Sequence, residues 1–556
     1  MGKKADSMNT LSPETLQYLQ REAEKLCRKG NSVGAECAIF TEDQLLFSYD
    51  YGKINKAKSL SSTMDSLYMI GSNTKMMTAM CCMKLMEEGK LDLLEDIRTY
   101  LPEFTVKTRN ARITVQDLLQ HRSGLQGDFW GLTRDQGMDA VLEAIKNTEL
   151  SYEPGTEFSY SNVGYTVLGL LIERLSGRSY ENYVRKTIGE PLGIRICFEK
   201  EDQPEFSCAY DQRGRETEDF VASMPGVSAG PHTYLSMRDF IRFCQVLLNH
   251  GAPILKSETM ALMESLPLRE PKDSQLLGYG YGMIHNHLCF PEVTVLGHGG
   301  DTSCHHSAFH YVKELNTGFA VMTNSASGVV LAGKLEILML ERLLKDEGLL
   351  SPVPVFSTRN MQVSREILGS FASPLGPLEI WQNRKGQLQG SLKGMHIHLR
   401  PAGEGWLQCI PIGASALIPG VRKNFEHFYI KPARYLGKVV LLAQSGKTNF
   451  FCRSILAARA ENAPIHPAFL TAQGTYEPAD LRIRQGMPMT LKLKARDGKL
   501  LVSSRSQGQT MQILLRSVSD SEAVIQGFGR FSGEHIILNS EENTVQYAGI
   551  TFHKIK

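Results

Sequence analysis

The sequence predicts an α+β protein: an antiparallel sheet flanked by helices, with a helical region, followed by two small antiparallel β domains. Three observations support this. Strand-like runs stand at both ends of the first 350 residues, helical periods fill the stretch between them, and short strands and turns dominate after residue 357. A chain of 556 residues also exceeds the size at which one core keeps growing, so two or three domains are expected.

The composition narrows the class of protein. With 42% hydrophobic and 22% charged residues, it is ordinary for a soluble globular protein. A formal net charge of +2 and the lack of a dense Lys/Arg stripe argue against nucleic acid as a partner. No apolar run reaches the ~18 residues that span a bilayer, and no signal peptide is recognisable, so no membrane partner is expected. The eleven scattered cysteines fit reduced thiols, and we expect a cytoplasmic protein.

The first element is an amphipathic helix over residues 12–29. Ser12 can cap it, Pro13 suits its first position, and Gly30 can end it.

Strand-like runs follow this helix. Residues 33–40 and 44–52 are separated by a short polar break, which predicts a hairpin. A third apolar stretch, 66–70, leads into the sequence GSNTK at 71–75. From 73 to 88 apolar residues occur on every side of the helical period, so a deeply buried helix is expected there.

The rest of the first domain, residues 1–350, alternates between the two types of element. Residues 91–250 are mainly helical in pattern. Strand-like runs then return, and a helix closes the domain before a proline-containing linker at 351–357. These later runs lie at 279–286, 293–300, 306–312 and 318–325, and the helix at 329–348.

Two β domains are expected at 357–456 and 468–556, each a barrel or a lipocalin-like domain. Their sequences echo each other, which indicates an internal duplication. The matching positions are Phe371 with Tyr476, the strand 378–380 with 481–483, and the turn glycine Gly386 with Gly498.

Ser72 and Lys75 are the first residues that point to chemistry. A serine hydroxyl needs a base within hydrogen-bond reach and donors for the oxyanion that forms. Ser72 stands at the N-terminal end of the predicted buried helix, where free N–H groups favour negative charge. Lys75, one turn on, can act as the base if desolvation lowers its pKa. The alternative is a capping serine beside a solvated lysine.

A second candidate pair precedes the helical pattern that starts near residue 162. Tyr160 beside a lysine ammonium would have its phenolate stabilised, and it could then relay a proton from Ser72 to the leaving group. Asn162 could hydrogen-bond a substrate amide. Its alternative role is capping of the helix, which asparagine does well.

The third candidate follows a strand pattern at 293–300. His298 could orient or charge-stabilise a site, and Gly299 and Gly300 on an edge strand would let an extended ligand approach closely. The backbone N–H of Asp301 could pair with that of Ser72 as oxyanion donors.

Together, S-x-x-K, Y-x-N and H-x-G in this order resemble the penicillin-recognising serine hydrolases, which are also known as S12-type peptidases. This group contains AmpC-type β-lactamases, D-alanyl-D-alanine carboxypeptidases, D-aminopeptidases and related esterases. Segments 113–125, 153–177 and 228–243 also look like parts of this family, so the resemblance covers about residues 12–346. It implies a β-lactamase-like fold for the first domain.

The resemblance also implies roles for individual residues. Ser72 would be the acylated nucleophile, Lys75 and Tyr160 the proton-transfer pair, Asn162 a ligand of the substrate amide, and His298 the third-motif residue. The order in which Lys75 and Tyr160 accept the proton stays open, because their titrations would be coupled.

Gln120 and His121 would shape the cleft, and Gln120 would bind substrate, although structural roles are the alternative for both. Gly299, Gly300 and Asp301 would complete the substrate-binding side.

Departures from the family pattern narrow the expected activity. Many β-lactamases of this kind carry K-T-G where this chain has H-G-G, and histidine there resembles the D-aminopeptidases and esterases. The trailing β domains look like those of the family's multidomain peptidases, in which an appended domain can reach over the cleft. We therefore expect a peptidase or amidase, similar to D-aminopeptidases, acting on a small peptide, amide or ester without a cofactor. Esterase or β-lactamase activity and a non-catalytic penicillin-binding-type sensor or scaffold are the alternatives, and a homo-oligomer stays open.

Two other motifs in the sequence suggest different chemistry. The sequence GVSAG at 226–230 fits the G-x-S-x-G nucleophile pattern, and Ser228, Asp239 and His298 keep a triad formally possible, but prolines on both sides argue against the strand it needs. The cluster of Cys304, His305 and His306 invites a metal hypothesis, but alternating strand faces would separate these side chains.

Overall fold

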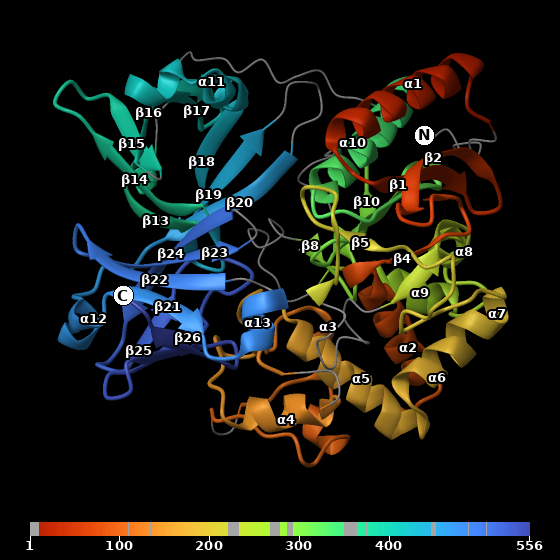
Figure 1. Ribbon diagram of the computed structural model, residues 1–556, viewed down its shortest axis with the longest axis horizontal. Helices are drawn as coiled ribbons and strands as arrows, with labels where there is room; N and C mark the ends of the chain where they lie inside the picture. Colours follow the sequence, from red (N-terminus) through yellow and green to blue (C-terminus); the bar gives the residue numbers. More distant parts are fainter. Residues whose placement is uncertain are drawn as a thin grey trace.

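The computed structural model describes most of the chain, and Figure 1 shows its three bodies. A sheet-and-helix domain holds the N-terminal part, and two β-barrels form the C-terminal part. The described residues are 10–108, 111–132, 136–220, 233–266, 278–285, 293–349, 364–373, 375–392, 394–445, 452–486, 489–506 and 509–556. The expected α+β class and the antiparallel character of the C-terminal domains are confirmed.

The central sheet of the first domain has eight strands in the order β3-β2-β1-β12-β11-β10-β9-β8. The predicted hairpin is present, because β1 and β2 pair antiparallel, and β12 pairs with the other side of β1. The first and last strands of the domain thus meet at its centre. The bounds are β1 Gly34–Thr41, β2 Leu45–Asn55, β3 Leu60–Ser61, β8 Gly278–Tyr279, β9 Ile284–His285, β10 Val295–Asp301, β11 His306–Val312 and β12 Thr317–Thr323.

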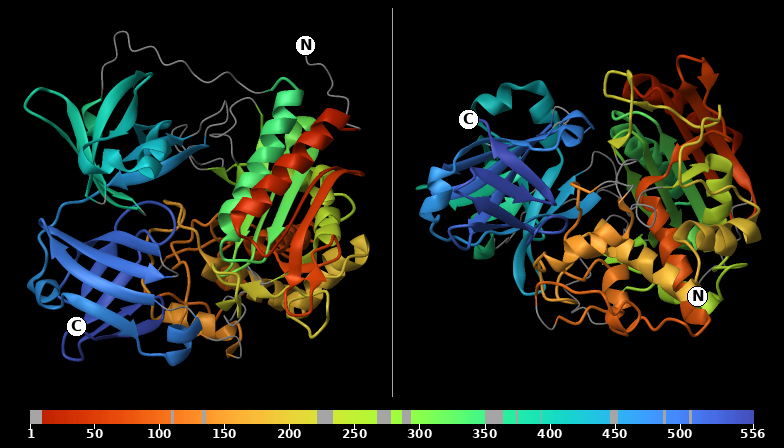
Figure 2. Two further views of the ribbon diagram at one scale, coloured as in Figure 1. Left: turned by 45° about the horizontal axis from the view of Figure 1, so that its top comes forward. Right: turned by 60° about the horizontal axis from the view of Figure 1, so that its bottom comes forward.

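Helices cover both faces of this sheet. The predicted first helix is α1 (Pro13–Gly30), capped by Ser12, and it packs beside α10 (Gly328–Asp346) on one face (Figure 2). The left-handed residue that ends α1 is Asn31, with φ 55°, and not Gly30. Asparagine tolerates this conformation almost as well as glycine.

The other face carries the helical region and its core. The predicted buried helix is α2 (Thr74–Glu87), whose side chains are almost all buried. Because α2 is buried on all sides, its sequence carries apolar residues around the whole helix. The remaining elements of this domain are α3 Val115–Leu119, α4 Asp139–Lys146, α5 Asn162–Ser176, α6 Tyr180–Val184, α7 Glu190–Leu192, α8 Met237–Leu248, α9 Ser257–Met263, β4 Leu67–Met69, β5 Ala209–Tyr210, β6 Glu216–Thr217 and β7 Tyr234–Ser236.

Both C-terminal β domains are closed eight-stranded barrels. Barrel 1 consists of β13 Gly369–Ser373, β14 Gly376–Gln382, β15 Leu388–Leu392, β16 Met395–Gly403, β17 Trp406–Pro411, β18 Phe428–Tyr435, β19 Lys438–Ser445 and β20 Cys452–Arg459, with α11 Pro419–Phe425. Barrel 2 consists of β21 Gly474–Pro478, β22 Met489–Arg496, β23 Lys499–Ser506, β24 Gln509–Ser517, β25 Glu522–Ile525, β26 His535–Asn539, β27 Thr544–Tyr547 and β28 Ile550–Lys554, with α12 Pro467–Thr471 and α13 Leu481–Gly486.

One part of the predicted duplication is wrong. The segment 481–483, which we matched to the strand at 378–380, belongs to helix α13. The side chain of Asp480 accepts the backbone N–H of Arg482 at 2.8 Å, which starts a helix in place of a strand. The equivalent of β14 is therefore β22, and the turn glycines Gly386 and Gly498 follow these two strands.

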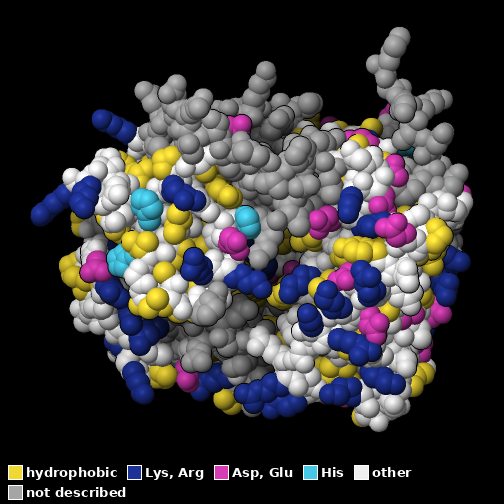
Figure 3. All heavy atoms as spheres, turned by 90° about the horizontal axis from the view of Figure 1, so that it is seen from above, with side chains coloured by type: hydrophobic (Ala, Val, Ile, Leu, Met, Phe, Trp, Pro, Cys, Tyr) yellow, Lys and Arg dark blue, Asp and Glu magenta, His cyan; other side chains and the backbone are white. Residues whose placement is uncertain are grey.

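The predicted linker at 351–357 and the GVSAG segment at 226–230 lie outside the described residues. Within the described ranges, no helix is long and apolar enough to cross a membrane, and no group of three metal-ligating side chains occurs. Figure 3 shows Lys and Arg side chains on one face of the molecule, interspersed with acidic and apolar ones.

Candidate active site

The turn that carries Ser72 is locked against the sheet. Ser72 lies in a single 3-10 turn, Gly71–Asn73, directly before α2. Asn73 Nδ2 donates to Ser307 Oγ at 2.7 Å, and this hydroxyl donates to the carbonyl oxygen of Ile70 at 2.6 Å. Gly71 has φ +54°, and a Cβ there would lie 2.7 Å from the backbone nitrogen of Asp301. The turn Gly71–Asn73, named the nucleophile turn after the role expected of Ser72, is therefore in direct backbone contact with the end of β10.

Lys75 lies beside Ser72 as the i,i+3 spacing predicts. Its Nζ is 3.1 Å from Ser72 Oγ and donates to Asn162 Oδ1 at 2.6 Å. The side chain is fully buried. This burial, and then the positive charge of Arg530, hold the pKa of Lys75 well below its usual range. The solvated lysine of the alternative interpretation is thus excluded, and the neutral amine is favoured.

Tyr160 lies at the same place, with its ring centroid 4.9 Å from Lys75 Nζ. Burial raises the pKa of Tyr160, and a hydrogen bond with Ser72 and the charge of Arg530 oppose this rise only in part. The expected stabilisation of a phenolate by Lys75 is not what this environment favours, because a buried lysine loses its own charge. Tyr160 is a neutral phenol in the resting site.

Asn162 is not the helix cap. The side chain of Ser161 caps α5 by accepting the backbone N–H of Gly164. Asn162 instead reaches Lys75 through Oδ1 and donates from Nδ2 to Asp128 Oδ1 at 2.8 Å. Both ends of its carboxamide are thus held by the site.

His298 is buried, with 3% of its surface exposed. Its Nδ1 donates to the carbonyl oxygen of Gly299, and its Nε2 therefore accepts the hydroxyl of Tyr279 at 3.1 Å. Burial, and then the charge of Lys75, lower the pKa of His298 to about 3. The ring is neutral at pH 7, so an orienting role fits and charge stabilisation does not.

The segment after His298 lies close to the nucleophile turn. Strand β10 is not the edge of the sheet. Strand β9 pairs with its residues Leu296 and Gly297, and among the described residues no strand pairs with 298–301 on that side. A Cβ on Gly300 would lie 1.9 Å from the carbonyl oxygen of Ile70, whereas a Cβ on Gly299 would meet nothing within 4 Å. Gly300 thus serves the contact with the nucleophile turn, and the open space is at Gly299.

The backbone N–H of Asp301 faces the nucleophile turn. The backbone N–H of Thr302 donates to the carbonyl oxygen of His305, and thus points toward the β11 side. Because successive N–H groups along a strand point to opposite sides, the N–H of Asp301 points away from β11. This direction fits the expected second oxyanion donor.

Gln120 and His121 are both about 1% exposed. His121 Nδ1 accepts the backbone N–H of Ser161 at 3.0 Å, and the centroid of its ring lies 4.1 Å from that of Tyr160 with the two rings tilted by 34°. Gln120 lies against Tyr281. His121 therefore packs against Tyr160 in the wall of the site, whereas the substrate contact expected of Gln120 stays a prediction.

Three site residues were not identified from the sequence: Asp128, Tyr279 and Arg530. Asp128 links Asn162 to Arg530, whose terminal nitrogen lies 2.5 Å from Asp128 Oδ2. Arg530 comes from barrel 2, 402 residues away in sequence. The available signal was the glycine-rich stretch 527–533, which has an arginine at its centre.

The competing motifs receive no support from the described residues. Ser228 lies outside them, and both ring nitrogens of His298 are occupied by Tyr279 and Gly299, so none is left for Asp239. His305 and His306 bind different carboxylates, those of Asp219 and Asp301.

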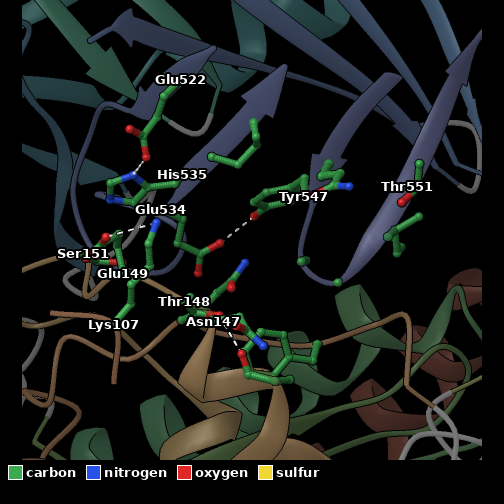
Figure 4. A pocket seen from close by; sticks show the side chains of 18 residues that line it. Lys107, Asn147, Thr148, Glu149, Ser151, Glu522, Glu534, His535, Tyr547 and Thr551 are labelled. Atoms are coloured by element: carbon green, nitrogen blue, oxygen red, sulfur yellow. Dashed lines mark hydrogen bonds and ion pairs between the residues drawn. The ribbon is translucent and has the colours of Figure 1, made fainter. Parts of the chain in front are cut away.

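A cavity of about 470 Å³ lies between barrel 2 and the first domain (Figure 4). Glu534 is in its wall, where Oε2 accepts the hydroxyl of Tyr547 at 2.8 Å and Oε1 accepts the N–H of Gly127 at 2.7 Å. Its lining residues are Lys107, Gln126, Phe129, Ala144, Asn147, Thr148, Glu149, Ser151, Glu522, Glu534, His535, Ile537, Gln546, Tyr547, Ala548, Gly549, Ile550 and Thr551.

Comparison with known proteins identifies the family of the chain. The profile of the Beta-lactamase family matches residues 19–343, which is more than half of the chain. The chain belongs to this family. It is accordingly related to hydrolases, and the first domain has the β-lactamase-like fold expected from the motifs.

Curated relatives match over part of their length. "Protein flp" of Staphylococcus aureus (strain N315) is 30% identical over 188 residues, which is 33% of this chain and 38% of that protein. A "Putative D-alanyl-D-alanine carboxypeptidase" of Escherichia coli O157:H7 is 31% identical over 224 residues, 36% of this chain and 51% of that protein. The match therefore spans at most about half of these relatives.

Solved structures share the fold at low identity. "Crystal structure of SurE with D-Leu" aligns with a TM-score of 0.54 at 20% identity, covering 81% of this chain and 100% of that one. "EstCE1, a hydrolase with promiscuous acyltransferase activity" gives 0.54 at 19% identity, covering 59% and 98%. The "octameric penicillin-binding protein homologue from Pyrococcus abyssi" gives 0.50 at 22% identity, covering 80% and 98%.

Proposed function

We propose that this protein is a serine hydrolase that forms an acyl-enzyme on Ser72, and that it acts as a peptidase or amidase on small peptides or amides. The observation that carries the proposal is the 3.1 Å contact between Ser72 Oγ and the fully buried Lys75 Nζ. A neutral amine at hydrogen-bond distance is what a serine hydroxyl requires to become a nucleophile.

The acylation step follows from these contacts. Lys75 takes the proton of Ser72 as Oγ forms a bond to the substrate carbonyl carbon. The resulting oxyanion is stabilised by the backbone N–H groups of Ser72 and Asp301. When the intermediate collapses, the bond to the leaving nitrogen or oxygen breaks, and the phenol of Tyr160 donates its proton to that atom. Tyr160 then recovers a proton from the Lys75 ammonium.

Deacylation reverses the proton flow. A water molecule gives a proton to the neutral amine of Lys75 as its oxygen attacks the acyl carbon. When the bond between Ser72 Oγ and that carbon breaks, the Lys75 ammonium returns a proton to Oγ. Lys75 is the better candidate for the first base, because burial favours its neutral amine and the protonated phenol of Tyr160.

Asn162 retains hydrogen-bonding capacity for a substrate amide. Its carboxamide has a second lone pair on Oδ1 and a second N–H on Nδ2 beyond the contacts with Lys75 and Asp128. His298 and Gly299 would form the opposite wall, where the open space at Gly299 suits an extended substrate.

The peptidase or amidase activity, similar to that of D-aminopeptidases, is supported by H-G-G in the third motif and by Arg530 of barrel 2, which reaches the site beside Asp128 and Tyr160. Esterase or β-lactamase activity at the same Ser72 is the second candidate, supported by the fold shared with EstCE1. A non-catalytic sensor or scaffold is the third. We also propose domains at 1–350, 357–456 and 468–556, a cytoplasmic location and a homo-oligomer, the last prompted by the octameric neighbour.

The test compares hydrolysis by the wild type, Ser72→Ala and the exposed control Ser61→Ala. D- and L-aminoacyl anilides, simple esters and a chromogenic cephalosporin are assayed side by side. We expect Ser72→Ala to abolish turnover of every accepted substrate without changing the circular dichroism spectrum, and Ser61→Ala to match the wild type. Undiminished turnover by Ser72→Ala would contradict the proposal.

A further inference from the structure

The loop between β25 and β26 of barrel 2, residues 526–534, is part of the wall of the candidate active site. Ser532 Oγ accepts the hydroxyl of Tyr152 at 2.5 Å, and the carbonyl oxygen of Gly529 accepts the hydroxyl of Ser159 at 3.3 Å. Gly533, with φ +81°, lies so close that a Cβ would be 2.7 Å from the Tyr152 ring. The loop is therefore fixed to the segment that leads into Tyr160.

At the centre of this loop, Arg530 projects toward the catalytic groups. Its guanidinium carbon lies 5.6 Å from the centroid of the Tyr160 ring, and one terminal nitrogen pairs with Asp128. The side chain of Arg530 is 42% exposed, whereas that of Asp128 is 3% exposed. Nε and the second terminal nitrogen make no hydrogen bond to any part of the chain that the structure describes. Arg530 thus keeps free donors in an accessible position.

Arg530 differs from the other basic groups near Ser72 because it keeps its positive charge. Burial favours the neutral forms of Lys75, His121 and His298, and Asp128 is paired. A guanidinium remains charged at any pH at which the protein is folded. Among the described groups around Ser72, Arg530 is therefore the cation that a substrate meets.

We propose that Arg530 is a specificity-determining residue that binds a carboxylate of the substrate. This inference rests on the proposed function and deepens it: the preferred peptides, amides or esters carry a negative charge near the scissile bond. A guanidinium with free N–H donors forms charge-assisted hydrogen bonds with a carboxylate, and it repels an ammonium. On the side of the scissile bond that Arg530 faces, a substrate with an ammonium group is therefore disfavoured relative to one with a carboxylate. A carboxylate preference on the acyl side would count against an aminopeptidase and leave the other peptidase, amidase and esterase activities of the proposed function in place.

The experiment uses matched ester pairs and the full chain. On the acyl side, p-nitrophenyl hydrogen adipate is compared with its methyl ester. On the leaving-group side, 3-acetoxybenzoate is compared with its methyl ester. We expect the wild type to prefer the carboxylate in one pair by about tenfold to a hundredfold in kcat/KM, which is the range of a hydrogen bond to a charged group. The pair that shows the preference identifies the side that Arg530 contacts.

Arg530→Gln should reduce this ratio to about one, mainly by lowering kcat/KM for the carboxylate, and Arg530→Lys should retain part of it. Because Arg530→Gln leaves Asp128 buried without its partner, the double variant Asp128→Asn, Arg530→Gln removes both charges and should show the same lost preference. Arg496→Gln, an exposed arginine of the same barrel, is the control and should keep the wild-type ratio.

Two outcomes would overturn the inference: no carboxylate preference in the wild type, or a preference that survives in Arg530→Gln and in the double variant. The proposed function fails separately, if Ser72→Ala hydrolyses the neutral esters as well as the wild type does.

Discussion

Replacing Arg530 by glutamine is expected to shift the pH dependence of catalysis, because this cation contributes to the low pKa of Lys75. Lys75 Nζ and the Arg530 guanidinium carbon lie 4.9 and 5.6 Å from the centroid of the same Tyr160 ring. Lys75 Nζ and the guanidinium carbon can therefore be no further apart than about 10.5 Å. At this separation each disfavours the charge of the other.

The size of the effect follows from Coulomb's law. At this largest separation, two unit charges interact with about 1.6 kcal/mol at an effective dielectric constant of about 20, and a shorter separation raises the energy. This energy corresponds to about one pKa unit. Solvent around a guanidinium that is 42% exposed weakens the interaction, so a shift of about half to one unit is expected.

The assay is the pH profile of kcat/KM for a neutral ester. The wild type should lose activity as pH falls, because the Lys75–Tyr160 pair takes up a proton. The apparent pKa of this acid limb belongs to the pair, because the titrations of the two residues are coupled. In Arg530→Gln the pKa of Lys75 rises, and this acid limb should move to higher pH. Asp128→Asn combined with Arg530→Gln should move it less, because Asp128 opposes Arg530. Arg496→Gln should leave it in place.

An acid limb that stays in place in Arg530→Gln, or moves to lower pH, would refute this reasoning. It would mean that the charge of the barrel loop does not reach the base of the site.

Three further predictions concern positions that support the site. Burial raises the pKa of Glu534 to about 7, so the native state gains stability as pH falls from about 8 to 5. In thermal scans, Glu534→Gln should therefore have a higher melting midpoint than the wild type at pH 8 and the same midpoint at pH 5. Burial alone would raise the pKa of Asp219, but hydrogen bonds from His305 and Thr302 lower it to about 2. The stability that this carboxylate contributes to the native state is present above about pH 4 and is lost as pH falls through 2. Asp219→Asn should therefore lower the free energy of unfolding by about 2 kcal/mol at pH 7, and urea titrations should show a smaller difference near pH 2.5. Gly71→Ala should reduce kcat by about a hundredfold or more, because the added Cβ would push the backbone N–H groups of Ser72 and Asp301 apart. Single-turnover rates equal to those of the wild type would contradict this prediction.

Much of the fold could be predicted from local patterns. The helix α1, the β1–β2 hairpin and the buried α2 each follow from a periodicity within one stretch of sequence. The segment 481–483 was misassigned because its similarity to a strand outweighed the capping carboxylate of Asp480 beside it. Local hydrogen bonding decided its structure.

The candidate site was predictable where its residues are neighbours in sequence. Ser72 and Lys75 meet because three residues make about one helical turn. The link from Asp128 to Arg530 joins segments 402 residues apart, and no spacing in the sequence indicates which loop of a barrel reaches the cleft. Gly300 was assigned to ligand approach, but its contact with Ile70 is visible only once β10 and the nucleophile turn are placed together.

The most direct test of the account is to identify the residue that becomes acylated. The full chain is treated with a fluorophosphonate or a penicillin, digested, and analysed by mass spectrometry. The account predicts one stoichiometric adduct on the peptide that contains Ser72, and none in Ser72→Ala. An adduct on another serine such as Ser228, or rapid hydrolysis of substrate with Ser72 left unmodified, would contradict it.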